Sequence, residues 1–289
     1  MSTPQHGHDI ALLEPGRTFG VIGTGVMGQT ILKGLFDAGA LKRDAVWGSD
    51  KTEQTCQSAG ASLGIPVETD ISARIPSAGV IVFCVKPAQA AEAVAKLRDS
   101  GLRPDTLLVS ILAGTTLQQL ESLSGTSNPW VRAMPNTPCT IGEGMTVICP
   151  GTHATAAHLA RARRIFQCVG KCLQSEEMHF NAITALSGSG PAYHYLIMEA
   201  MADAGVRVGL PRDLALSLVA QTALGSARMV QTVGRHPAAL RDDVTTPAGC
   251  TIAGLLMLED GKIRSVLARA IEEATRTAAG LGKNEEPRT

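Results

Sequence analysis

The sequence predicts an α/β fold in which a doubly wound parallel sheet comes first and an all-α region follows. Three observations predict it. Short β-branched runs alternate with helical patterns in the first part of the chain, a glycine-rich turn joins the first run to a helix, and strand-like runs disappear from residue 175 onward. Alternating strands and helices are typical of a parallel sheet that carries helices on both faces.

Composition narrows the class of protein further. The chain has 289 residues, 44% of them hydrophobic, which suffices for two domains with a core each. Its 26 Lys and Arg balance 26 Asp and Glu, so no basic surface for nucleic acid is expected. No apolar run approaches the roughly 20 residues of a membrane span, and the first residues lack a secretion signal. We therefore expect a cytoplasmic protein without nucleic-acid or membrane partners.

The cysteines favour the same compartment. There are seven, an odd number, and none forms a CxxC pair. This pattern indicates reduced thiols rather than a disulfide framework or a zinc site, so no metal site is expected.

The first strand and the turn after it form the most informative local motif. Thr18–Ile22 reads as a buried strand and continues into Gly23-Thr24-Gly25-Val26-Met27-Gly28, after which apolar residues follow helical spacing. In a dinucleotide site the first glycine makes the turn, the second lets the pyrophosphate approach the backbone, and the third permits close packing of helix on strand. The turn therefore predicts a Rossmann-type domain.

The next strand, Ala45–Trp47, ends where the adenosine ribose is expected. Gly48, Ser49, Asp50 and Lys51 follow it. An acidic residue here usually binds the ribose 2′-hydroxyl of NAD, whereas Ser with Lys could hold the 2′-phosphate of NADP. These signals conflict. Taking Ser49 and Lys51 as phosphate partners, we expect NADPH in preference to NADH.

Two further loops follow expected strands at the ligand edge of the sheet. Strands are expected at Val80–Val85 and Leu107–Ile111, with a helical stretch at Pro87–Leu97 between them. The loops are Cys84-Val85-Lys86-Pro87 and the segment from Arg132 to Pro138. The Asn136 amide could bind a nicotinamide, hold a neighbouring loop or stabilise its own turn. A strand at Met145–Ile148, a helix at Ala154–Phe166 and a strand at Lys171–Leu173 complete this domain.

Long helical patterns fill the remainder of the chain. One helix is expected near Glu176, and another opens at Ser187-Gly188-Ser189-Gly190-Pro191. Two more are marked by apolar residues at Leu214–Met229 and Val266–Ala274. Their broad apolar faces predict burial against a second copy, as a homodimer. The expected organisation is a flexible tail at 1–17, a dinucleotide-binding domain at 18–174, a helical substrate and dimerisation domain at 175–282, and a flexible tail at 283–289.

One stretch of the helical region has the features of an anion site. A polar run from Val244 to Cys250 opens onto a helical pattern that continues to Glu259. The first turn of a helix leaves about four N–H groups unpaired and carries partial positive charge, which suits a carboxylate. The alternative is that Thr246 or Thr251 only caps the helix.

With these motifs in place, the chain resembles pyrroline-5-carboxylate reductase from Thr18 to Gly282. The motifs that carry the resemblance are IGTGVMG, VKP, MPNTP, ALSGSGPAY, ADAGVRVGLPR and DVTTPAGCTIAGLLMLE. The resemblance implies a Rossmann domain followed by helices that intertwine into a dimer, or an assembly of dimers. It also implies NAD(P)H-dependent reduction of 1-pyrroline-5-carboxylate to L-proline, the last step of proline biosynthesis.

The resemblance also implies site residues. Thr251 is the expected catalytic residue, contacting the ring nitrogen of the substrate. The other expected substrate-binding residues are Glu177, Asp242, Asp243, Thr246, Gly249 and Cys250. The expected cofactor-binding residues are Ile22, Gly23, Thr24, Gly25, Val26, Met27, Gly28, Ser49, Lys51, Cys84, Val85, Lys86, Pro87, Ile111, Leu112, Ala113 and Asn136.

The chain departs from the family pattern in three places. Thr246-Pro247-Ala248-Gly249 stands where the family usually has SPGG, and Gly48-Ser49 and the Asp70-Ile71 region replace Asn-containing segments near the cofactor. Two other functions remain possible: reduction of a related cyclic imine or other small acid on this fold, and nicotinamide-nucleotide binding without turnover. Related β-hydroxyacid reductases use a lysine on the long helix, and Pro191–Ala204 contains none.

Overall fold

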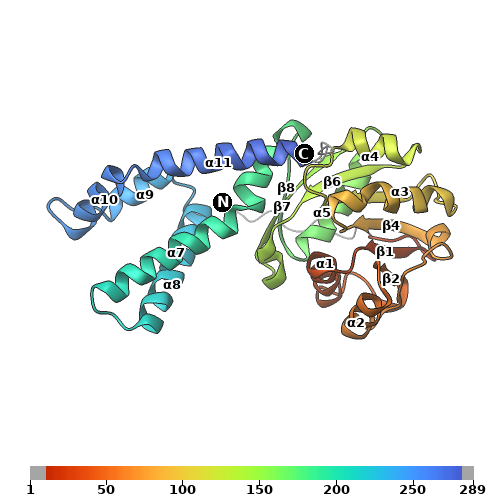
Figure 1. The fold of residues 1–289 in the computed structure, drawn as a ribbon, viewed down its shortest axis with the longest axis horizontal. Helices are drawn as coiled ribbons and strands as arrows, with labels where there is room; N and C mark the ends of the chain where they lie inside the picture. Colours follow the sequence, from red (N-terminus) through yellow and green to blue (C-terminus); the bar gives the residue numbers. More distant parts are fainter. Residues whose placement is uncertain (1–10, 282–289) are drawn as a thin grey trace, which may run out of the picture. The chain divides into compact units, whose positions relative to one another are not determined.

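The computed structural model describes residues 11–281 (Figure 1). The expected tail residues 1–10 and 283–289 lie outside this range. Residues 11–17, which the sequence analysis assigned to the tail, contact the sheet. Leu12 is only 3% exposed, and Arg17 donates a hydrogen bond to the carbonyl oxygen of Ala78.

The described residues form two compact units. The first runs up to Gly188 and includes the segment from Ala274, and the second is Ser189–Glu273. The division falls later than the boundary expected at residue 175. Phe180, which is buried among sheet residues, keeps the short turns after the last strand in the first unit.

The first unit contains an eight-stranded sheet in the order β3-β2-β1-β4-β5-β6-β7-β8. All neighbouring strands are parallel except β6 and β7. The first six strands follow the order 3-2-1-4-5-6, which is that of dinucleotide-binding sheets. The strands are β1 Thr18–Ile22, β2 Val46–Ser49, β3 Val67–Glu68, β4 Ala78–Phe83, β5 Leu107–Ser110, β6 Trp130–Met134, β7 Gly144–Pro150 and β8 Gly170–Gln174.

The doubly wound parallel sheet that the sequence predicted is confirmed, and among the described strands only β7 pairs antiparallel with its neighbour β6. The connection from Met134 to Gly144 contains only the 3-10 helix Thr137–Ile141. A parallel return needs a crossover of about a dozen residues or more, usually an α-helix. The shorter connection therefore reverses the chain direction.

Helices cover both faces of the sheet. Successive residues of β4 alternate between two buried clusters: Val80 and Val82 pack with α1 and α5, and Ile81 and Phe83 pack with α3 and α4. This alternation is the period-two pattern of a strand buried on both sides. The helices of this unit are α1 Val26–Asp37, α2 Glu53–Leu63, α3 Ala90–Asp99, α4 Leu117–Ser124 and α5 Ala156–Gln167.

In place of the single helix that the sequence predicts near Glu176, the structure has three short helical turns. They are the 3-10 helix Glu177–His179, the α-helix α6 Phe180–Ile183 and the π-helical turn Thr184–Gly188. π-helical turns are rare and are frequently found at functional sites. This turn leads directly into the Ser-Gly motif that opens the next helix.

The second unit is helical, as the sequence predicted. It contains α7 Gly190–Arg207, α8 Arg212–Val233, α9 Pro237–Asp243, α10 Cys250–Asp260 and the beginning of α11 Ile263–Gly280. Figure 1 shows α7 and α8 side by side as a hairpin, and Gly205 faces Ala215 at their contact. The short helix α9 was not expected from the sequence.

Large apolar side chains remain exposed on these helices. The exposed side chains include Leu214, Leu216, Leu218, Leu224, Met229, Val230 and Val233 on α8, and Leu256, Met257 and Leu258 on α10.

No helix among residues 11–281 combines the length and hydropathy that a membrane crossing requires.

Candidate functional site

The expected cofactor residues of the first unit meet at one edge of the sheet. Ile22 of β1 is in register with Ser49 of β2 and Phe83 of β4, and Phe83 is in register with Ser110 of β5. The loops after all four strands therefore begin at the same level. This edge, at the strand where the order reverses, is where open α/β sheets bind their ligands.

The glycine-rich turn after β1 fits a dinucleotide. Gly23 has a φ of +96°, and a Cβ there would lie 2.6 Å from the carbonyl carbon of Cys84. A Cβ on Gly28 would collide with the carbonyl oxygen of Gly23, whereas one on Gly25 would meet nothing within 4 Å. Gly25 is also the N-cap of α1 and offers no side-chain cap. The free space at Gly25, the second of the three glycines, and the uncapped start of α1 suit a pyrophosphate.

The residues after β2 are arranged around Asp50. Its Oδ2 accepts hydrogen bonds from the Thr24 backbone N–H at 2.9 Å and from Thr24 Oγ1 at 3.1 Å. Ser49 is only 7% exposed, whereas Lys51 is exposed. The carboxylate, rather than the serine hydroxyl, thus faces the glycine-rich turn.

The two loops after β4 and β5 are held by backbone bonds. The Cys84 N–H donates to the Ile22 carbonyl at 2.7 Å, and the Ile111 N–H donates to the Phe83 carbonyl at 3.1 Å. Burial raises the pKa of the Cys84 thiol, which keeps it neutral. Lys86 is exposed beside it. The loop Cys84–Pro87 therefore lies beside the glycine-rich turn, and the loop Ile111–Ala113 follows the next strand along the same edge.

Asn136 holds a neighbouring loop. Its Nδ2 donates to the Ser187 carbonyl at 3.2 Å and to Ser187 Oγ at 3.4 Å, and its Oδ1 accepts from the Met145 N–H at 2.9 Å. Both ends of the amide are therefore engaged within the protein. Its contact with a cofactor stays a prediction.

Glu177 links three elements of the first unit. Its Oε1 accepts from the Leu117 N–H at the start of α4, at 2.7 Å, and from Arg132 on β6 at 2.9 Å. Arg132 is 3% exposed, and its guanidinium lies 4.8 Å from the ring centroid of Phe180. Arg132 was expected at the start of a loop but lies within β6, and a buried arginine in a strand carries no local motif.

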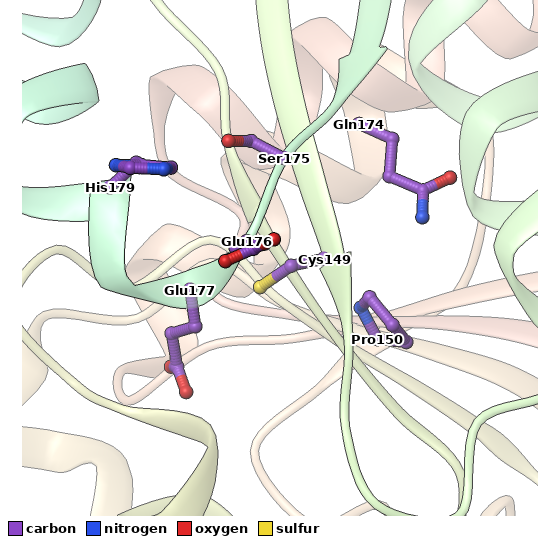
Figure 2. Close-up of a pocket in the computed structure, with 7 residues that line it drawn as sticks. All are labelled: Cys149, Pro150, Gln174, Ser175, Glu176, Glu177 and His179. Atoms are coloured by element: carbon purple, nitrogen blue, oxygen red, sulfur yellow. The ribbon is translucent and has the colours of Figure 1, made fainter.

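A cavity of about 640 Å³ lies beside this ion pair. Figure 2 shows Cys149, Glu176, Glu177 and His179 among the side chains around it. Burial, together with the Glu177 charge, raises the pKa of the Cys149 thiol to about 12, against the opposing effect of Arg132. At neutral pH this thiol is protonated and a weak nucleophile.

In the second unit, the loop before α10 has the form expected of an anion site. Gly249 is the N-cap of α10 and has no side chain, so neither Thr246 nor Thr251 caps this helix. The Gly249 N–H donates to the Thr246 carbonyl at 3.1 Å and closes a turn through Pro247 and Ala248. Ala248 has a φ of +56°, a conformation that favours glycine. The N–H groups at the start of α10 are therefore left without a side-chain partner.

The acidic residues before this loop have arginine partners. Asp242 accepts from Arg241 at 2.8 Å, and Asp243 pairs with Arg235 across α9. The hydrogen bond from Arg235 holds the pKa of the Asp243 carboxyl below its usual value. The Asp243 carboxylate thus stays ionised, which disfavours an anion on its side of the loop. Their contact with substrate stays a prediction.

Comparisons with known proteins agree on one family. Residues 177–281 match a family model described as pyrroline-5-carboxylate reductase dimerisation, and residues 18–114 match one described as NADP oxidoreductase, coenzyme F420-dependent. The pyrroline-5-carboxylate reductase of Arabidopsis thaliana is 40% identical over 93% of this chain and 98% of its own length. That of Escherichia coli is 34% identical over 93% of this chain and 99% of its own.

Solved structures give the same relationship. A pyrroline-5-carboxylate reductase from Coxiella burnetii has a TM-score of 0.85 and 31% identity, covering 93% of this chain and 99% of its own. The Plasmodium falciparum pyrroline carboxylate reductase with NADP bound has a TM-score of 0.81 and 30% identity, covering 92% and 98%.

The first prediction concerns the Glu177 ion pair. Glu177→Ala leaves the buried Arg132 guanidinium and the Leu117 N–H without their acceptor, and we expect a loss of about 2 kcal/mol in the free energy of unfolding. Glu177→Gln keeps a neutral acceptor and should lose about 1 kcal/mol. Urea unfolding measures both. Glu176→Ala, at the neighbouring position, is the control and should change stability little. Equal losses at both positions would contradict a specific role for the pair.

The second prediction concerns Ala248. Because its positive φ is strained for an L-residue, Ala248→Gly should raise the free energy of unfolding by about 0.5 to 1 kcal/mol. Ala253→Gly, inside α10, should lower it by a similar amount because glycine weakens a helix interior. Thermal and urea unfolding of both variants test this. A loss of stability in both would mean that residue 248 is not strained.

Proposed function

This chain belongs to the pyrroline-5-carboxylate reductase family, and we propose that the strand-end loops of the first unit bind the dinucleotide and that the loop before α10 binds the substrate. The protein is an NAD(P)H-dependent oxidoreductase that reduces the C=N bond of 1-pyrroline-5-carboxylate to give L-proline. No observation favours another imine or a binding protein without turnover.

The uncapped start of α10 is the observation that supports assigning the loop before it to the substrate. The substrate has a carboxylate, and the N-terminus of an 11-residue helix with glycine as N-cap presents N–H groups and partial positive charge to it. The groups assigned to this anchor lie at Thr246, Gly249, Cys250 and Thr251.

Thr251 is assigned to the ring nitrogen. Its side chain makes no hydrogen bond to any of residues 11–281 and is half-buried, so its hydroxyl is available to a ligand. A cyclic imine becomes electrophilic when its nitrogen is protonated, and the bound dinucleotide supplies the hydride. A hydroxyl is a weak general acid at neutral pH, so Thr251 orients the nitrogen, and the proton comes with the iminium or from water.

The dinucleotide is assigned to the turn Ile22–Gly28, the loops Cys84–Pro87 and Ile111–Ala113, and Asn136. NADP is the cofactor, in agreement with the matched NADP oxidoreductase model and with the NADP-bound Plasmodium falciparum relative. We assign the 2′-phosphate to Lys51 and expect NADPH to be preferred over NADH. Ser49 lies buried at the end of β2, so the exposed ammonium of Lys51 supplies most of this interaction.

The assembly is a homodimer formed through the region matched by the dimerisation model, residues 177–281. Exposed leucines on α8 and α10 supply an apolar surface for it. We further assign the protein to the cytoplasm, because all seven cysteines are free and a reducing compartment keeps them so.

The activity itself is tested by following NADPH and NADH oxidation with pyrroline-5-carboxylate and with its six-membered analogue. Turnover with the five-membered imine and formation of L-proline are expected. Absence of turnover with either cofactor would contradict the assignment, and faster reduction of the six-membered imine would favour a related substrate.

The third prediction concerns Thr251. Removing its hydroxyl in Thr251→Ala or Thr251→Val should lower kcat about ten- to a hundredfold, the effect of one directed hydrogen bond in the transition state. Thr251→Ser should retain much of the activity. Steady-state kinetics measure this, with melting curves as the control for folding.

The valine variant decides the outcome for Thr251, because valine keeps the shape of threonine without the donor. An unchanged kcat in Thr251→Val would remove the hydroxyl from the mechanism. A parallel loss of melting temperature and activity in all three variants would indicate a structural role instead.

The fourth prediction concerns the dimer. Leu224→Glu places a charge on an exposed apolar face of α8 and should shift the protein toward monomer in sedimentation equilibrium, because burying an unpaired charge is unfavourable. Gln57→Glu, on exposed α2, is the control and should leave the assembly unchanged. A folded wild-type monomer at micromolar concentration would contradict an obligate dimer.

A further inference from the structure

We propose that Asp50, held against the glycine-rich turn by Thr24, limits the preference of this enzyme for the 2′-phosphorylated cofactor and keeps NADH usable. The inference rests on the proposed cofactor site and names the residue that sets its selectivity.

The position of the Asp50 carboxylate is fixed from several sides. Oδ2 accepts from the Thr24 N–H at 2.9 Å and from Thr24 Oγ1 at 3.1 Å, and Oδ1 accepts from the Lys51 N–H at 2.8 Å. Thr24 is fully buried, and its carbonyl accepts from Gln29 Nε2 at 2.9 Å. The Asp50 side chain therefore cannot rotate away from the glycine-rich turn without losing three hydrogen bonds.

The carboxylate retains capacity for a ligand. Two carboxylate oxygens offer about four acceptor sites, and the protein uses three of them. An acidic residue at the end of this strand is placed to accept from ribose hydroxyls. A 2′-hydroxyl gives Asp50 a donor, whereas a 2′-phosphate brings only acceptors and a second negative charge.

The surroundings of Asp50 do not compensate its charge. Glu68 on β3 is in register with Ser49 and pairs with Arg74 at 2.7 Å. Glu53 accepts a hydrogen bond from Thr69. Arg74 is thus already paired, whereas the exposed Lys51 directly follows Asp50 and can attract a phosphate. The negative charge of Asp50 therefore opposes the attraction of Lys51 for a 2′-phosphate.

The size of the effect follows from the separation of the charges. Two like charges a few ångströms apart near a protein surface repel strongly enough to change affinity by about ten- to a hundredfold. Neutralising Asp50 should therefore strengthen NADP⁺ binding relative to NAD⁺ by about tenfold or more. Because salt screens exposed charges, this gain should shrink at high ionic strength.

Calorimetric titration of NADP⁺ and NAD⁺ into the full-length protein, without imine, tests the proposal. Asp50→Asn keeps the shape and one acceptor for Thr24, and the Kd ratio should move toward NADP⁺ by about tenfold. Lys51→Gln should move the ratio in the opposite direction. Asp44→Asn, which removes the same charge before β2, is the control and should leave the ratio unchanged. The ratio of kcat/KM for NADPH and NADH should follow the binding ratio.

Two results would overturn the proposal. If Asp50→Asn weakens both cofactors equally and lowers the melting temperature, Asp50 only braces the turn. If the ratio does not move while the fold is intact, the 2′ position lies elsewhere. Failure of the proposed function is distinct, since it would appear as no imine reduction with either cofactor whatever the binding ratio.

Discussion

The close approach of the backbone between β1 and β4 determines where the cofactor residues lie. Gly23 has a positive φ, and a Cβ there would lie 2.6 Å from the carbonyl carbon of Cys84, so only glycine lets the two loops meet. The Cys84 N–H bonds the Ile22 carbonyl at 2.7 Å across the same gap. The register of the neighbouring strands places the loops after β2 and β5 at the same edge. Any larger residue at 23 would separate the loops after β1 and β4.

The helical unit has a different constraint, because it cannot bury its own apolar surface. The contact of α7 with α8 is made by small residues, Gly205 and Ala215, which lets the helices approach closely. The large leucines of α8 and α10 are left exposed in one chain. We therefore expect dimerisation to accompany folding, with a stability that depends on protein concentration.

Much of the first unit could be predicted from the sequence, because strands buried on both faces and a glycine-rich turn are local patterns. The direction of β7 was missed because Arg132–Met134 was assigned to a loop instead of β6, which concealed the short connection between the two strands. The roles of Arg132 and Glu177 also depend on contacts between distant segments. For Asn136, the residues alone left three possibilities, and the bonds to Ser187 and Met145 favour the one in which it holds a loop. Side-chain contacts of this kind join residues far apart in the chain, so no periodic pattern in the sequence reveals them.

Ala248 and Asp50 both depart from what the resemblance or the expected NADPH preference implied, and both sit where backbone bonds hold the chain. The Gly249 N–H closes the turn around Ala248, and the Thr24 N–H fixes Asp50. Strain of about 1 kcal/mol at such a turn is small beside the 5 to 15 kcal/mol that stabilises a domain. The same energy at a ligand contact changes affinity by roughly tenfold. A substitution at Asp50 can therefore alter the choice of cofactor while the fold stays unchanged.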